Sequence, residues 1–104
     1  METIDIHHSG LKPLPGKRSW ALVGVVASGN LEVLLERQAE SDRCDVHIET
    51  SVPGFDTLWR AVVEEFVTRA TPGGLRISIN DCGARPDTVS LRLLQGARLM
   101  EDAT

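Results

Sequence analysis

The sequence predicts a two-layer sandwich of the α+β class, in which two helices cover one face of a mainly antiparallel four-stranded sheet in the order βββαβα. Three observations support this prediction. Several segments alternate apolar and polar residues, which is typical of strands with one dry face. Two later segments repeat apolar residues at spacings of three and four, which is typical of helices packed on a sheet. The length of 104 residues suits one small core.

The composition excludes several classes of protein. Hydrophobic residues make up 41% and charged residues 25% of the chain, so neither disorder nor a membrane span is expected. The longest uncharged apolar stretch, residues 20–27, is far shorter than the about 20 residues that cross a bilayer. A net charge of -4 repels phosphate backbones, so nucleic acid is not expected as a partner. Glu2 and Asp5 stand where a secretory signal would be basic, so a cytoplasmic location is expected.

Residues 1–18 are predicted to form a flexible N-terminal arm, and residues 19–104 a single domain. The first segment contains His7, His8 and several glycines and prolines, a composition that interrupts regular packing. A lightly anchored edge strand is the alternative for this segment.

Two strands joined by a tight turn are predicted next. Residues 20–26 are apolar on both faces, which indicates a central strand, and Gly24 indicates a bulge or a close approach of another backbone. Residues 31–36 alternate and predict a strand with one inward face. Ser28, Gly29 and Asn30 lie between the two runs, and these residue types suit turns.

Residues 44–52 alternate strictly and predict a third strand, which Pro53 and Gly54 end. Asp56 stands where a carboxylate would meet the positive end of a helix. The helix is predicted to stop at Thr71-Pro72-Gly73-Gly74. Its apolar face consists of Phe55, Leu58, Trp59, Val62, Val63 and Phe66.

Residues 75–80 alternate and predict a fourth strand, followed by a loop over residues 81–85. Pro86 can open a second helix. Residues 88–93 also alternate, so a short strand is the alternative there. The apolar side of the helix would carry Val89, Leu93, Leu94, Ala97 and Met100.

No catalytic residue and no metal ligand is predicted. His7 and His8 are adjacent but lack a third ligand at a recognisable spacing, and His47 is expected on a solvated strand face. Cys44 and Cys82 lie far apart without CxxC spacing, so both are expected to be reduced and at least half-buried.

The residues next to Ser28 predict only a structural role for it, because a Ser-Gly-Asn sequence suits a tight turn. The surrounding sequence, however, resembles the acyl carrier subunit (delta subunit) of biotin-independent malonate decarboxylase. The similarity lies in ALVGVVASGNLEVLLE at residues 21–36, TSV at 50–52 and INDCGARPDTVSLRL at 79–93. The carrier subunit of citrate lyase is more distantly similar.

The resemblance implies that Ser28 carries covalent 2'-(5''-phosphoribosyl)-3'-dephospho-CoA through a phosphodiester. We also expect Gly29 and Asn30 to help a modifying enzyme to reach this serine. Two positions depart from the family pattern, since Ala27 replaces an expected glycine and Asn30 an expected aspartate. The chain lacks the Asp-Ser-Leu signature of carriers that bear phosphopantetheine.

The resemblance further implies a non-catalytic subunit of a multisubunit complex. An acyl transferase subunit would exchange acetyl for malonyl on the cofactor thiol, a decarboxylase subunit would release CO₂, and a separate transferase would attach the prosthetic group. Two alternatives stay open. The chain is a carrier for a related lyase of the citrate lyase type, or it is an interaction domain that binds through its uncovered sheet face while Ser28 serves only the turn.

Overall fold

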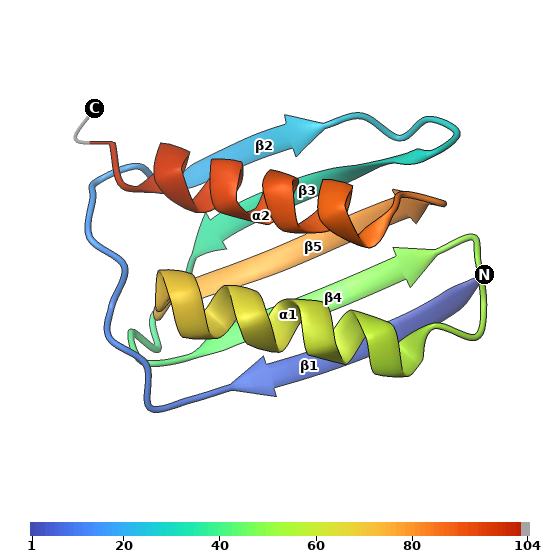
Figure 1. Cartoon of the computed structure of the whole chain (residues 1–104). Coiled ribbons are helices and arrows are strands. Elements are labelled where there is room, and N and C mark those ends of the chain that lie inside the picture. The colour runs from blue at the N-terminus through green and yellow to red at the C-terminus, as the bar shows by residue number, and fades with distance from the viewer. Residues whose placement is uncertain (103–104) are drawn as a thin grey trace.

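A computed structural model describes residues 1–102, which form a five-stranded sheet with two helices packed on one face (Figure 1). The two-layer α+β class is therefore confirmed. The strands are β1 (Glu2–His8), β2 (Trp20–Gly24), β3 (Asn30–Arg37), β4 (Cys44–Thr50) and β5 (Leu75–Cys82), and the helices are α1 (Asp56–Ala70) and α2 (Pro86–Met100).

The sheet has the strand order β1-β4-β5-β3-β2. β4 and β5 run parallel, and the other three neighbouring pairs are antiparallel. The parallel pair is possible because α1 carries the chain back across the sheet between the two strands, and parallel neighbours need such a crossover. The predicted four-stranded sheet thus has one strand too few, while its mainly antiparallel character is correct.

The additional strand is β1, so the prediction of a flexible arm is wrong for Glu2–His8. β1 pairs with β4 along its whole length, from Glu2 opposite Thr50 to His8 opposite Cys44. Ile4 and Ile6 provide the physical reason, because both side chains alternate into the core and are 2% and 5% exposed. The edge strand named as the alternative is what the structure contains.

The rest of the predicted arm is held by backbone hydrogen bonds, such as the one from the Leu14 N–H to the Gly73 carbonyl oxygen at 2.9 Å, and by one guanidinium group. The side chain of Arg37 donates hydrogen bonds to the carbonyl oxygens of Arg18, Leu14, Pro15 and Met100, at 2.9, 2.7, 3.0 and 2.7 Å. The Leu14 side chain is buried. Residues 9–19 therefore close against the end of α2 as part of the same domain.

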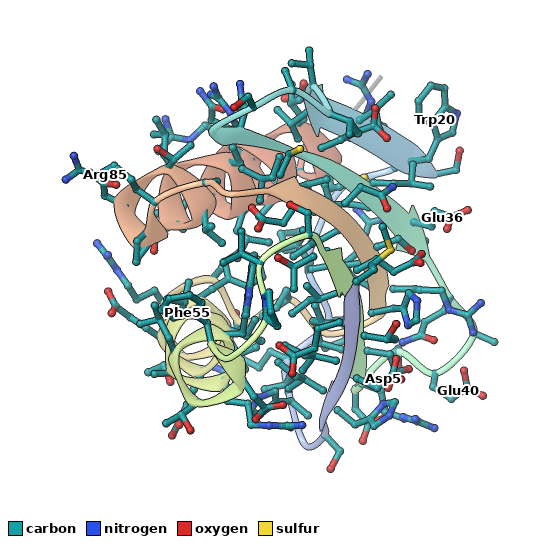
Figure 2. All side chains as sticks on the ribbon, turned by 90° about the vertical axis from the view of Figure 1, so that its right-hand side faces the viewer. Asp5, Trp20, Glu36, Glu40, Phe55 and Arg85 are labelled. Atoms are coloured by element: carbon teal, nitrogen blue, oxygen red, sulfur yellow. The ribbon has the colours of Figure 1, made fainter. Side chains whose placement is uncertain are left out.

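β2 is an edge strand, so the prediction of a central strand at residues 20–26 is wrong. Trp20 and Leu22 are 56% and 49% exposed on the sheet face opposite the helices, where Figure 2 also places Glu36 and Asp5. The close backbone approach predicted at Gly24 is confirmed. This glycine has a φ of +80°, and a Cβ atom there would lie 2.1 Å from the carbonyl oxygen of Leu31.

The core lies between the sheet and the two helices. The exposure of Leu91, 52%, decides between the two predictions for residues 88–93, because a strand would place Leu91 beside Val89 and Leu93, which are both buried. The helix prediction is correct.

Gly96 lets α2 approach β3 closely, since a Cβ atom there would lie 2.3 Å from Leu35 Cδ1. Within residues 1–102, no helix is long and apolar enough to cross a membrane.

Three connections meet at one edge of the sheet, the edge formed by the ends of the strands, on the right in Figure 1. They are the β2–β3 turn, the β4–α1 connection and the β5–α2 connection. This arrangement follows from the pairing. β4 and β5 end together, with Thr50 opposite Asp81, and β3 begins where β5 ends, with Asn30 opposite Cys82. The N-termini of both helices lie at the same edge.

Candidate functional site at the β2–β3 turn

Ser28 occupies the tip of a tight turn between two paired strands. The backbone N–H of Asn30 donates to the carbonyl oxygen of Ala27 at 2.9 Å, which closes a four-residue turn. Gly29 has a φ of +76°, whereas the φ of Ser28 is not positive. This combination defines a type II turn with Ser28 at the second position and glycine at the third, where a positive φ is required.

A central strand holds the base of this turn. The backbone N–H of Gly29 donates to the carbonyl oxygen of Cys82 at 2.7 Å, at the end of β5. Asn30 begins β3, and its side-chain oxygen accepts a hydrogen bond from the N–H of Leu31 at 2.8 Å. Ser28 therefore stands on a rigid support although its own side chain is exposed.

The space around Ser28 is open. Residues 25–29 are exposed, and a Cβ atom added at Gly29 would meet no heavy atom within 4 Å. Within residues 1–102 the Ser28 hydroxyl has no side chain in hydrogen-bond contact that would act as a base. A nucleophilic serine needs an adjacent base to be activated, so the geometry presents this hydroxyl to another molecule without activating it.

The histidines are not brought to the turn. His7 and His47 lie on β1 and β4, where their Nδ1 atoms are 2.6 Å from Asp45 Oδ1 and 2.7 Å from Asp5 Oδ1. The hydrogen bond that His47 donates to the Asp5 carboxylate raises the pKa of His47 above its usual value. β5 separates these strands from β3, so the pairs form a solvated sheet face away from Ser28. Among the described residues, no group of three side chains is arranged to hold a metal ion.

Both cysteines are free, and their predicted burial is correct. Cys44 is buried and Cys82 is half-buried. Burial raises the pKa of the Cys44 thiol to about 12, so this side chain stays protonated and unreactive near neutral pH.

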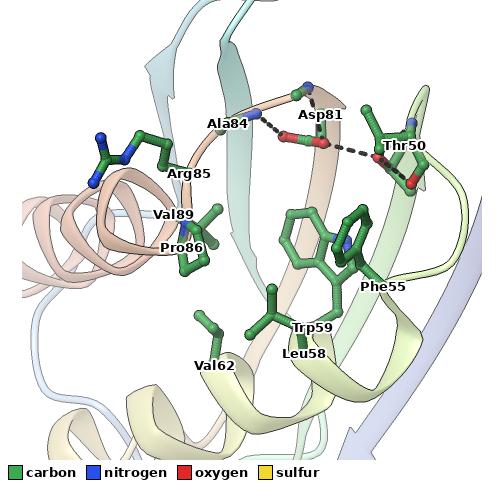
Figure 3. Close-up of a pocket in the computed structure, with 12 residues that line it drawn as sticks. Thr50, Phe55, Leu58, Trp59, Val62, Asp81, Ala84, Arg85, Pro86 and Val89 are labelled. Atoms are coloured by element: carbon green, nitrogen blue, oxygen red, sulfur yellow. Dashed lines mark hydrogen bonds between the residues drawn. The ribbon is translucent and has the colours of Figure 1, made fainter.

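A buried polar cluster at the same edge was not predicted from the sequence. Asp81, only 7% exposed, accepts hydrogen bonds from the Thr50 hydroxyl at 2.8 Å and from the N–H groups of Gly83 and Ala84 at 3.1 and 2.9 Å (Figure 3). Residues 81 and 82 extend β5, so the predicted loop begins two residues too early. The sequence did contain a signal for this position. If the alternation of Leu75, Ile77 and Ile79 is continued by two residues, it predicts that Asp81 faces inward.

A groove opens beside this cluster, between the N-terminal parts of α1 and α2 (Figure 3). Its volume is about 270 Å³. The walls are mainly apolar and include Phe55, Leu58, Trp59, Val62, Val89 and Pro86. Sequence patterning predicted most of these side chains as helix faces but not the hollow between the faces.

A small rigid domain that holds the exposed, unactivated Ser28 hydroxyl at the tip of a turn fits the class of carrier domains, which present an attached group to other proteins. The family comparison agrees with this class. Residues 18–100 match the family model described as malonate decarboxylase delta subunit (MdcD). The chain belongs to this family.

Curated relatives and a solved structure support the same assignment. A malonate decarboxylase acyl carrier protein of Bradyrhizobium diazoefficiens is 53% identical over 94% of this chain and 93% of its own length. That of Burkholderia cepacia is 52% identical over 93% and 88%. A chain in the crystal structure of a Pseudomonas malonate decarboxylase hetero-tetramer in complex with malonate is 39% identical, with a TM-score of 0.84 over 96% of this chain and 99% of that chain.

Proposed function

We propose that this chain is the acyl carrier subunit of a biotin-independent malonate decarboxylase and that Ser28 is its covalent attachment site. The prosthetic group is 2'-(5''-phosphoribosyl)-3'-dephospho-CoA, joined to the serine through a phosphodiester and bearing acetyl or malonyl as a thioester. The observation that carries the proposal is the exposed Ser28 hydroxyl at the tip of a rigid turn, inside the segment that matches the family.

The residues around Ser28 fit a bulky anionic group. Gly29 leaves the neighbouring space open, so a large substituent on the hydroxyl meets no obstacle. The N-termini of α1 and α2 lie at the same edge (Figure 1), and helix N-termini favour negative charge, which Asp56 and Asp87 already supply in the first turns. Arg85, whose side chain is 83% exposed, is a cation at this edge, and its Nε lies 3.4 Å from Asp87 Oδ1.

When bound, the group supplies a thiol whose thioester carbonyl accepts the charge that remains when CO₂ leaves. The chain itself contributes an anchor and a rigid base. Among residues 1–102, no base lies beside Ser28, so bond making falls to acyl transferase and decarboxylase subunits, and the attachment step to a prosthetic-group transferase. A tethered acyl group stays at high effective concentration near two active sites in turn. The free thiols of Cys44 and Cys82 support a cytoplasmic setting for this work.

Intact-protein mass tests the attachment. We expect the mass of the wild-type chain, expressed with its maturation enzymes, to increase by one prosthetic group, and the mass of Ser28→Ala to stay that of the bare chain. Ser51→Ala is the matched control, because Ser51 is also exposed and lies at the same edge. An unmodified wild-type chain, or a modified Ser28→Ala chain, contradicts the proposal.

The substrate is tested separately. The assembled complex is supplied with malonate or with citrate, and CO₂ and oxaloacetate are measured. Release of CO₂ from malonate alone is expected, whereas formation of oxaloacetate from citrate would assign the carrier to the lyase type instead.

A further inference from the structure

The groove between α1 and α2 presents an almost entirely apolar surface to a ligand. Phe55 and Leu58 form its rim and are 48% and 42% exposed, while Trp59 is 6% exposed and lies deeper. Figure 3 shows the Leu58 and Val62 side chains facing into the same hollow as Trp59. Exposed apolar side chains gathered around one hollow are typical of a binding site.

The polar groups at the inner end of the groove are already used. The Asp81 carboxylate accepts three hydrogen bonds from Thr50, Gly83 and Ala84. The Thr50 oxygen in turn accepts from the N–H of Val52 at 3.1 Å. An occupant therefore gains little from hydrogen bonding here and must be a short, mainly apolar group.

One short segment of the chain connects the Ser28 turn with the groove. Gly29 is hydrogen-bonded to Cys82, and the next three residues along the chain, 83–85, line the groove. The path from the attachment oxygen to the groove thus crosses one short connection. Arg85 stands at the rim of the groove, with its guanidinium Nε 3.4 Å from Asp87 Oδ1 and most of the side chain in solvent (Figure 3).

We propose that this groove binds the thiol end of the chain's own prosthetic group, either free or acetylated, and that Arg85 contacts a phosphate of the arm as it passes the rim. The inference rests on the proposed function. A volume of about 270 Å³ lies at the lower limit of ligand pockets, which range from roughly 300 to 1,000 Å³. The groove therefore accepts a short acyl thioester and excludes the nucleotide part, which stays outside and leaves with the arm when a partner subunit binds it.

The two tryptophans provide a probe and an internal control. Trp59 lines the groove, whereas Trp20 is exposed on β2, on the opposite face of the sheet. We expect the indole N–H resonance of Trp59 to shift when the apo chain is converted to the acetyl-loaded form, and that of Trp20 to stay in place. In the form that bears the prosthetic group without an acyl group, iodoacetamide should also modify the free cofactor thiol of the wild-type chain more slowly than that of a variant with a blocked groove.

Leu58→Glu blocks the groove with a charge at a position that is already exposed, so folding should be retained. Leu91→Glu is the matched control, because Leu91 is an exposed leucine on the other helix and does not line the groove. Acetyl loading of Leu58→Glu should leave the Trp59 resonance unshifted, and the cofactor thiol of its unacylated form should be alkylated faster than that of the wild-type chain. Loading of Leu91→Glu should reproduce the wild-type results.

Failure of this inference is distinguishable from failure of the proposed function, because intact mass reports loading independently. A loaded chain whose Trp59 resonance does not move overturns the groove assignment and leaves the attachment at Ser28 standing. A chain that never gains mass overturns both. If the Trp59 resonance of the apo chain shifts on adding the purified catalytic subunits, while loading alone has no effect, the groove is a subunit contact and the inference is wrong.

Discussion

Removing the Asp81 carboxylate should strongly destabilise the domain. Asp81→Ala deletes three hydrogen bonds of 2.8 to 3.1 Å to a nearly buried carboxylate and leaves the buried Thr50 hydroxyl without that acceptor. Hydrogen bonds to charged groups contribute about 1.5 to 3 kcal/mol each. Gly83 is exposed and Ala84 is half-buried, so water can replace part of the two hydrogen bonds from their N–H groups. The expected loss is about 3 kcal/mol, near the sum of one buried and two partly replaced bonds.

The assay is urea unfolding, followed by far-UV circular dichroism and supported by thermal unfolding. A loss of about 3 kcal/mol corresponds to a lower Tm by roughly 10 to 15 °C for a domain of this size. Asp81→Asn keeps one carbonyl oxygen, so it should lose about 1 to 2 kcal/mol. A double-mutant cycle with Thr50→Val should show coupling, because the two side chains are in direct contact.

Glu64→Ala is the control, since Glu64 is an exposed carboxylate on α1, and its effect should stay within about 0.5 kcal/mol. If Asp81→Ala unfolds at the same urea concentration as Glu64→Ala, the carboxylate does not stabilise this edge of the sheet. The account of how the β4–α1 and β5–α2 connections are held together would then be refuted.

Three further predictions concern other parts of the molecule. Asp5 raises the pKa of His47, so this pair stabilises the fold at pH values below the ordinary histidine pKa and loses that contribution as pH rises through the raised pKa. The difference in unfolding midpoint between the wild-type chain and His47→Gln should therefore shrink from pH 5.5 to 8. A difference that stays constant over this range contradicts the prediction. Gly96→Ala places a methyl group against Leu35 in the core and should lose about 1 to 3 kcal/mol in urea unfolding, which Leu35→Val should partly restore; additive losses would show that the contact is not the cause. Gly29→Val strains a backbone of positive φ and crowds Ser28, so intact mass should show reduced loading with an unchanged circular dichroism spectrum, whereas Gly29→Asn, which tolerates this φ, should load; normal loading of the valine variant would mean that the open turn is not needed.

The sequence was sufficient for most elements because their signals are local. Alternation predicted the strands at residues 31–36, 44–52 and 75–80, and the structure differs from these bounds by at most two residues at either end. Spacing of three and four predicted α1 and α2. The turn at Ser28 also depends on local chemistry, since Gly29 supplies the positive φ that a type II turn requires. The role of Ser28 as an attachment site came from the family resemblance, and it stays a proposal.

The pairing of strands was decided only by the tertiary structure. β1 pairs with β4, and β5 pairs with both β3 and β4, through hydrogen bonds between segments whose alternation alone does not identify a partner. An apolar strand such as β2 therefore reads as central, although the fold leaves Trp20 and Leu22 exposed at an edge. The cluster around Asp81 and the groove beside it could not be predicted either, because both depend on which strands and helices become neighbours. Both exist only where the parallel ends of β4 and β5 bring the N-termini of α1 and α2 together. The apolar pattern of a single helix or strand does not predict the hollow that forms between the two helices.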